Sequence, residues 1–135
     1  MSKPEAKDAE LILRLYEMRR EPVLRAARAW FAAKFEAKTL AELHKKYKPG
    51  SQEDAYFRMV VSYWDMVGAL VYHKAVNPDL FFDTNREYLG VWRKVQQVVT
   101  ELRQQRSNPM LYENLEYLAR AHQMWAQKQQ PKQMP

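Results

Sequence analysis

The sequence predicts an all-α protein, an irregular bundle of five to seven helices around a central helix near residues 52–76. Each apolar stretch repeats with a period near 3.6 residues, which is the period of an amphipathic helix. The chain has three glycines, and most of its seven prolines fall between apolar stretches, where a proline starts or ends a helix. With 135 residues, 47% of them hydrophobic, the chain is long enough to bury one core.

The first two helices are predicted on either side of Pro22. Residues 8–20 place Leu11, Leu15 and Met18 on one helical face. Pro22 should end or kink this helix, because an interior proline clashes with the carbonyl four residues earlier. A second helix is expected from there to about residue 35, with an apolar face made of Leu24, Ala27, Phe31 and Phe35.

The central helix is predicted to follow a short one. Thr39 and Glu42 have the spacing of a capping box, which predicts a short helix to about residue 47. The turn at residues 49–51 ends it, and Ser51 is placed to cap the central helix. Gly68 indicates a close crossing with another helix. The broad apolar face of the central helix consists of Tyr56, Met59, Val60, Tyr63, Trp64, Val67, Leu70 and Val71.

The C-terminal half contributes three more helices. Asn77 and Pro78 are a cap and a first helical residue, so they predict a short helical turn through residue 82. Thr84 and Glu87 repeat the capping-box spacing ahead of a helix that runs to about residue 106. Ser107 is expected to cap the last helix. The apolar positions of the two long helices are Tyr88, Val91, Trp92, Val95, Val98, Val99 and Leu102, then Leu111, Leu115, Leu118, His122 and Trp125.

One helical domain is expected over residues 8–126. Residues 1–7 are predicted to be a flexible N-terminus, and residues 127–135 have no apolar face and are predicted to be a disordered tail. Residues 1–10 lack the apolar core of a signal peptide, and no run reaches the roughly 20 apolar residues that cross a bilayer. The sequence therefore predicts a cytoplasmic protein without a transmembrane segment.

Several positions together resemble a known family. They are Trp30-Phe31, the run from Tyr63 to Leu70, the run Val76-Asn77-Pro78-Asp79-Leu80-Phe81, Trp92, Arg103 and Asn108-Pro109. In these positions the chain resembles a bacterial family of short helical proteins described only as a domain of unknown function. The resemblance covers about residues 10–122 and implies an all-helical fold in a bacterial or phage protein. Because that family has no established activity, the resemblance implies no catalytic or binding residues.

Side chains that support catalysis or bind a metal form no recognisable pattern in the sequence. The absence of cysteine excludes disulfides, thiol nucleophiles and iron–sulfur clusters. Gly50, Gly68 and Gly90 are too far apart for a phosphate-binding loop, and the Glu-x-x-His pairs of a di-iron bundle are missing. We therefore predict no catalytic residue, no cofactor and no metal site, which favours a protein that is not an enzyme.

The three histidines all have structural interpretations. His44 lies in a basic, solvated run, and His73 lies near the C-terminal end of the central helix, where a cation favours the helix dipole. His122 is the polar residue to inspect, because it occupies the apolar face between Leu118 and Trp125. We expect an imidazole in the core or at its rim that is hydrogen-bonded to a backbone carbonyl or a tyrosine hydroxyl.

Positive charge is concentrated in the N-terminal half. The net charge is +6, and residues 1–50 hold twelve Lys or Arg against seven Asp or Glu, while residues 51–135 hold ten against nine. The basic side chains of this half include Arg28, Lys34 and Lys38. The candidate contacts for an anionic partner are Arg19, Arg20, Arg25, Lys45, Lys46 and Lys48. Because no nucleic-acid-binding motif accompanies them, we expect weak, nonspecific binding of nucleic acid at most.

The leading functional hypothesis is a non-catalytic protein-interaction or structural module. Four Trp, eight Tyr and five Phe supply contact surface in excess, while catalytic patterns are absent. The alternative is a binder of an anionic partner, either nucleic acid or a membrane surface, through the basic N-terminal half. A third hypothesis is an enzyme of unknown class, whose polar pocket would combine Tyr and Arg residues with His122.

A homodimer is also expected, because some large apolar residues fall outside the main apolar faces. A contiguous exposed patch of such residues usually marks an interface, and a twofold dimer is the commonest way to bury it. The residues in question are Tyr16, Phe57, Val61, Tyr72, Tyr112 and Tyr117.

Overall fold

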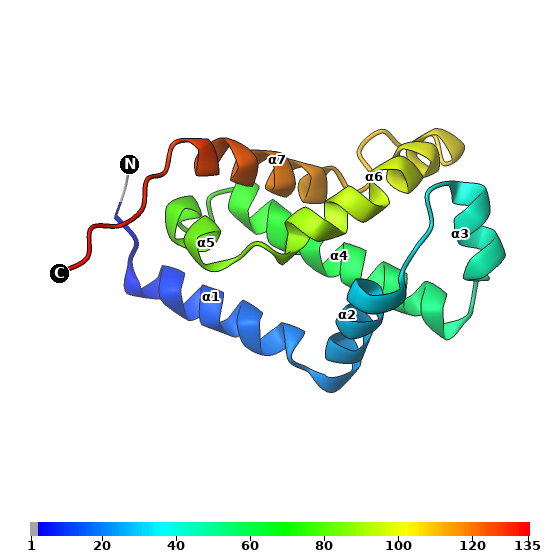
Figure 1. Cartoon of the computed structure of the whole chain (residues 1–135), viewed down its shortest axis with the longest axis horizontal. Coiled ribbons are helices and arrows are strands. Elements are labelled where there is room, and N and C mark those ends of the chain that lie inside the picture. Colours follow the sequence, from blue (N-terminus) through cyan, green and yellow to red (C-terminus); the bar gives the residue numbers. More distant parts are fainter. Residues whose placement is uncertain (1–2) are drawn as a thin grey trace.

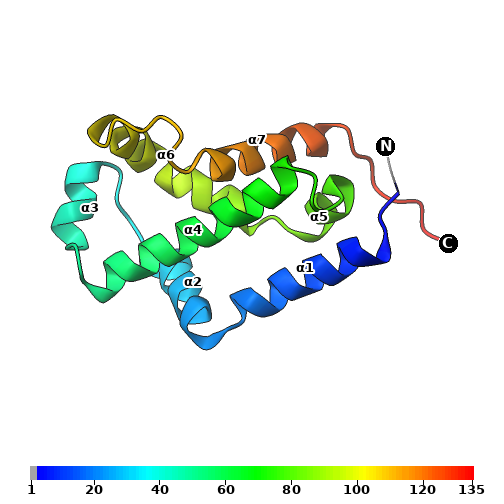
Figure 2. The ribbon, with the colours of Figure 1, turned by 180° about the vertical axis from the view of Figure 1, so that it is seen from behind.

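The computed structural model describes residues 3–135 and confirms the all-α prediction. Within these residues the chain forms seven helices and no strand. The helices are α1 (Ala6–Arg19), α2 (Pro22–Lys34), α3 (Leu40–Lys46), α4 (Gln52–Tyr72), α5 (Pro78–Thr84), α6 (Glu87–Gln105) and α7 (Glu113–Gln127). α1 and α7 run along opposite long sides of the molecule, with α4 between them, and α3 lies at one end (Figure 1). The view from behind shows the same arrangement (Figure 2).

Helix α4 is the centre of the bundle, as its apolar periodicity predicts. It packs mainly against α7 and α2. Because it has neighbours on two sides, it buries residues around much of its circumference, including Phe57 and Val61, which flank the main apolar face. The predicted C-terminal boundary at Val76 is wrong. The helix ends at Tyr72, because Lys74 adopts a left-handed conformation with φ 58°, and the chain turns to bury Val76 and begin α5.

Gly68 provides the close helix crossing that the sequence indicates. A Cβ atom built at Gly68 would lie only 2.2 Å from the backbone oxygen of Asn114 in α7. The backbone N–H of Leu115 donates to a carboxylate oxygen of Asp65 at 3.0 Å beside this crossing. A side chain at position 68 would therefore force the two helices apart.

Three of the predicted helix starts are correct. The side chains of Thr39, Ser51 and Asn77 accept hydrogen bonds from backbone amides in the first turns of α3, α4 and α5, at 3.1, 3.2 and 2.9 Å. These bonds satisfy amides that have no partner within the helix.

Two other predicted helix starts are wrong. Thr84 does not cap α6; it is the last residue of α5, where its hydroxyl donates to the backbone oxygens of Leu80 and Phe81. Ser107 does not cap α7 either. It adopts a left-handed conformation in the turn after α6, and α7 begins later, behind Tyr112, which is also left-handed.

The two ends of the predicted domain have different contacts. Residues 1 and 2 of the segment predicted to be flexible lie outside the described residues, and α1 already includes Ala6 and Lys7. The tail after α7 contains no helix, and its Lys132 lies 3.0 Å from a carboxylate oxygen of Asp83. Disorder of this tail stays a prediction. No helix found in residues 3–135 has both the length and the apolar character that crossing a bilayer requires.

A candidate groove between α2 and α6

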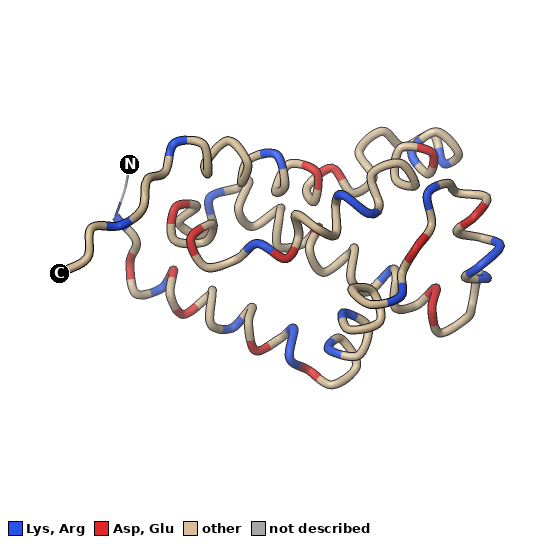
Figure 3. Tube along the Cα trace, in the orientation of Figure 1, with Lys and Arg blue, Asp and Glu red and all other residues tan. Residues whose placement is uncertain are grey.

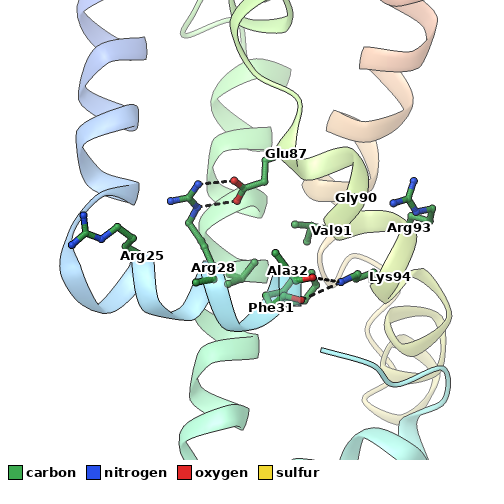
Figure 4. Close-up of a pocket in the computed structure, with 11 residues that line it drawn as sticks. Arg25, Arg28, Phe31, Ala32, Glu87, Gly90, Val91, Arg93 and Lys94 are labelled. Carbon is green, nitrogen blue, oxygen red and sulfur yellow. Dashed lines mark hydrogen bonds and ion pairs between the residues drawn. The ribbon is translucent and has the colours of Figure 1, made fainter. Parts of the chain in front are cut away.

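A pocket of about 470 Å³ lies where α2 and α6 face each other above α4 (Figure 4). The floor of the pocket is apolar, and the small residues in its lining leave the space between the helices open. Charged side chains surround the opening of the pocket. Val60 of α4 forms part of the floor. The lining residues are Arg25, Arg28, Ala29, Phe31, Ala32, Val60, Glu87, Gly90, Val91, Arg93 and Lys94.

Two polar bridges join α2 to α6, one at each end of the pocket (Figure 4). At one end, the guanidinium of Arg28 donates to both carboxylate oxygens of Glu87, at 2.6 and 2.9 Å. The indole N–H of Trp64 in α4 donates to the same carboxylate at 3.2 Å. At the other end, the Lys94 ammonium donates to the backbone oxygens of Phe31 and Ala32, both at 3.1 Å. These carbonyls belong to the last turn of α2, where a cation is favourable.

The Arg28–Glu87 bridge is ionised on both sides at neutral pH. Burial is the largest single influence on Glu87 and would raise its pKa. The hydrogen bonds and charge of Arg28, the hydrogen bond from Trp64 and the charge of Arg19 together outweigh burial and hold this pKa below its ordinary value. The hydrogen bonds between Arg28 and Glu87 also raise the pKa of Arg28. Glu87 also opens α6, where the helix dipole favours a carboxylate.

A second hollow, of about 400 Å³, adjoins the pocket beyond the end of α2. The two hollows share Arg93 and Lys94. The second one is otherwise lined by residues 33–38, which form the end of α2 and the segment leading to α3. We call the two hollows together the α2–α6 groove.

The groove carries six cations against two carboxylates. The carboxylates are Glu36 and Glu87, and the cations are Arg25, Arg28, Lys34, Lys38, Arg93 and Lys94. Arg28 and Lys94 are engaged in the two bridges. The side chains of the other four cations are exposed and have no hydrogen-bond or ion-pair partner among residues 3–135. They remain available to a ligand.

A family model described as a domain of unknown function (DUF4760) matches residues 4–125. The chain belongs to this family. The matched range contains every residue of the α2–α6 groove. No curated protein and no solved structure shows significant similarity to the chain. The DUF4760 assignment agrees with the helical fold and assigns no activity.

The candidate contacts for an anionic partner fall into two separate groups in this DUF4760 chain. Arg19, Arg20 and Arg25 lie around the α1–α2 corner, whereas Lys45, Lys46 and Lys48 lie on α3 and the turn after it (Figure 3). Of the six, Arg25 alone lines the groove.

Several of these six side chains already have partners. Arg19 donates to the side-chain oxygen of Asn85 at 3.2 Å, and its guanidinium lies 5.6 Å from the ring centre of Trp64. Arg20 donates to the hydroxyl of Tyr16. Lys46 pairs with Glu42 at 2.9 Å. The structure thus does not bring the six predicted contacts together into one site.

Sequence reasoning missed the contribution of α6 to the groove. Arg93 and Lys94 lie opposite α2, although more than sixty residues separate them from Arg28. The apolar periodicity of α6 shows which residues face the core, but it carries no information on which helix becomes a neighbour. The pairing of Glu87 with Arg28 likewise has no local sequence signal.

His122 lies in the core, away from the groove. Its side chain is 2% exposed, and its Nδ1 lies 2.6 Å from the hydroxyl of Tyr88. The Tyr88 hydroxyl also donates to the backbone oxygen of Asn85, so its lone pairs remain for an Nδ1–H of His122. The rings of Phe82 and Trp125 contact the imidazole. The tyrosine partner is of the kind expected from the sequence; that His122 has only a structural role stays a prediction.

Groups that could bind a metal are also dispersed. No three His, Asp or Glu side chains come together at a metal-binding distance anywhere in residues 3–135.

Proposed function

We propose that this protein is a non-catalytic protein-interaction module and that the α2–α6 groove is its binding face. One observation carries the proposal: an apolar floor between two helices is flanked by Arg25 and Arg93, and the adjoining hollow adds Lys34 and Lys38. All four cations are exposed and have no partner among the described residues. Binding sites for other molecules combine an apolar centre with a few convergent polar groups in this way.

The side chains of the groove favour binding over catalysis. Its lining includes no Ser, Thr, Tyr, Cys or His, so it offers neither a hydroxyl or thiol nucleophile nor an imidazole base. Arg28 keeps Glu87 ionised, and an ionised carboxylate with three donors around it is a poor general base. These features support a surface that recognises a partner.

The groove also favours a protein over nucleic acid or a membrane surface. Binding of single strands uses exposed aromatic rings on which bases stack, and insertion into a membrane surface uses exposed aromatic and aliphatic side chains. In the groove, the rings of Phe31 and Phe35 are 3% and 4% exposed. The basic residues first considered for such binding are divided between two parts of the molecule. Weak, nonspecific binding of nucleic acid at most therefore remains our proposal.

Site-specific photocrosslinking in cells tests the function. Benzoylphenylalanine is placed at Ala33, an exposed residue of the second hollow, and in a matched control at Met124, an exposed residue of α7. We expect a discrete protein adduct from Ala33, absent from Met124 and lost when Arg93 is changed to Glu. No protein adduct from Ala33, or equal adducts from both positions, would contradict the proposal.

A homodimer remains a second proposal, on a narrower basis. Of the six residues that motivated it, Phe57 and Val61 are buried and Tyr112 is half-buried. Tyr72 and Tyr117 are exposed and lie edge to face with ring centres 5.0 Å apart, and Tyr16 is exposed on α1. Light scattering with size exclusion checks it: a strict 16.1 kDa monomer at every concentration refutes the dimer.

A bacterial origin and a cytoplasmic location also remain proposals.

A further inference from the structure

We infer that the α2–α6 groove binds an acidic peptide segment in which carboxylates lie on both sides of an apolar residue. The inference rests on the proposed interaction function and adds the chemistry of the partner. Three properties of the groove lead to it: the sign of its charge, the positions of its unpaired cations and the size of its floor.

The charge of the groove selects an anion. Its six cations exceed its two carboxylates, and the bridge to Arg28 already satisfies Glu87. Each unpaired cation loses hydration when a partner covers it, so a neutral or basic partner would bury uncompensated positive charge. The guanidinium groups of Arg25 and Arg93 can hold a carboxylate through two parallel hydrogen bonds.

The positions of the unpaired cations select a chain over a compact ligand. Arg25 stands on the α2 side of the first hollow and Arg93 on the α6 side (Figure 4). Arg93 also lines the second hollow, where Lys34 and Lys38 continue the positive edge past the end of α2. A small anion contacts one of these cations, whereas a peptide with carboxylates at intervals contacts several of them.

The floor of the groove selects an apolar side chain between those carboxylates. Ala29, Ala32 and Gly90 are the small residues that leave the space open between the helices. A Cβ atom built at Gly90 would meet nothing closer than 3.9 Å, so the α6 side is not filled. Val60 and Val91 lie beneath, and burial of a single aliphatic side chain on them is favourable.

Selection from a phage-displayed library of random peptides tests this inference on the full-length chain. We expect the enriched peptides to carry Asp or Glu on both sides of Leu, Ile, Val, Met or Phe. Kd for an enriched peptide, measured by fluorescence anisotropy, should rise by about tenfold or more in Arg25→Glu and in Arg93→Glu, as expected when a charge-assisted hydrogen bond is lost.

Two further variants separate charge from shape. Lys45→Glu combined with Lys48→Glu reverses two exposed charges outside the groove and should leave Kd within about twofold, because distant exposed charges are screened by salt. Ala29→Leu fills the floor without a change in charge and should weaken binding. Circular dichroism of each variant establishes that it is folded.

The peptide experiments test the acidic-segment inference, and crosslinking at Ala33 tests the interaction function on which it rests. Neutral or basic enriched peptides, no enrichment, or equal weakening by the Lys45/Lys48 control would overturn the acidic-segment inference. A uridine-rich RNA that binds more tightly than the peptides at physiological ionic strength would overturn it as well. If Ala33 still crosslinks to a protein in cells, the interaction function survives that failure; if it does not, both fail.

Discussion

Two helix pairs in this chain, α4 with α7 and α2 with α6, come together in opposite ways. Gly68 lets α4 and α7 approach until the space for a single Cβ atom is gone. Between α2 and α6 the small residues Ala29, Ala32 and Gly90 also occur, but the space beside them stays open, and polar bridges link the two helices at the ends of the pocket. Small residues alone therefore do not determine how closely helices pack. Small residues lie at a closed crossing in one pair and beside an open groove in the other.

The largest effect should come from Gly68. In Gly68→Ala the new methyl group overlaps the Asn114 backbone oxygen, so the helices must separate, and we expect a loss of about 1–3 kcal/mol or more in the free energy of unfolding. The matched control is Gly90→Ala, where the methyl group has room and the helix gains up to about 1 kcal/mol from propensity. Urea denaturation measures both. Changes of the same sign in the two variants would remove the contrast between the helix pairs.

The next effect concerns the bridge between α2 and α6. Glu87→Gln keeps the shape of the side chain but removes the charge that Arg28 faces, so we expect a loss of about 1–2 kcal/mol in the free energy of unfolding. Glu17→Gln is the matched control, because the exposed Glu17 carboxylate has no partner among the described residues. Denaturation midpoints that are equal in the two variants would show that the bridge does not stabilise the fold.

Acidification should act on the two regions at different pH. Burial lowers the pKa of His122 in α7 below its ordinary value of 6.5, so the unfolded chain takes up a proton that the folded imidazole resists. The free energy of unfolding should therefore fall as pH drops through about 6.5. The pKa of Glu87 is held below its ordinary value of 4.5, so its contribution is complete above about pH 4.5 and is lost as pH falls through the lowered value.

Two variants show which side chain causes the change in stability in each pH range. In His122→Phe the Tyr88 hydroxyl keeps its bond to Asn85, so the fold should persist and the dependence near pH 6.5 should disappear. In Glu87→Gln the dependence near pH 6.5 should remain, and the one below pH 4.5 should become shallower. Urea denaturation across pH measures both, and the reverse pattern would mean that the two groups have been assigned to the wrong ranges.

The smallest effect on stability should come from the unpaired cations of the groove. Arg25→Glu and Arg93→Glu change exposed side chains without partners among residues 3–135, so each should shift the free energy of unfolding by less than about 0.5 kcal/mol. Thermal denaturation checks this. A large loss in either variant would mean that these cations stabilise the fold and are not reserved for a partner.

The sequence predicts the elements of this fold better than their ends and neighbours. The period near 3.6 residues identifies the five long helices, the capping signals at Thr39 and Asn77 mark the two short ones, and Ser51 marks the start of α4. Thr84 misleads because a threonine hydroxyl can also bond back to a carbonyl one turn earlier, within its own helix. The end of α4 depends on the left-handed conformation of Lys74, a residue with no local preference for it.

The groove could be predicted only in part. Arg25, Arg28, Lys34 and Lys38 belong to a basic segment that is visible in the sequence. Their separation from Lys45 and Lys48 depends on where α3 packs, and the role of Arg93 depends on α6 facing α2. Tertiary packing determines the position of α3 and the neighbour of α6, and helical periodicity in the sequence gives no information on either.

Helix α1 has few attachments, and this has a consequence for local unfolding. It buries only Asp8 and Leu15, whereas α4 buries eight residues. Among residues 3–135, four hydrogen bonds link α1 to α2 and to the parts of the chain after α2. The Asn77 amide donates to Asp8 at 2.9 Å and the Tyr63 hydroxyl to the Leu15 carbonyl at 2.6 Å, and at the C-terminal end of α1 Arg19 donates to Asn85 and accepts from Arg28. A segment with little buried surface opens at a lower free energy than the whole domain. Amide protons of α1 should therefore exchange with solvent before those of α4, and a protease should cut near Pro22 while the groove is still intact.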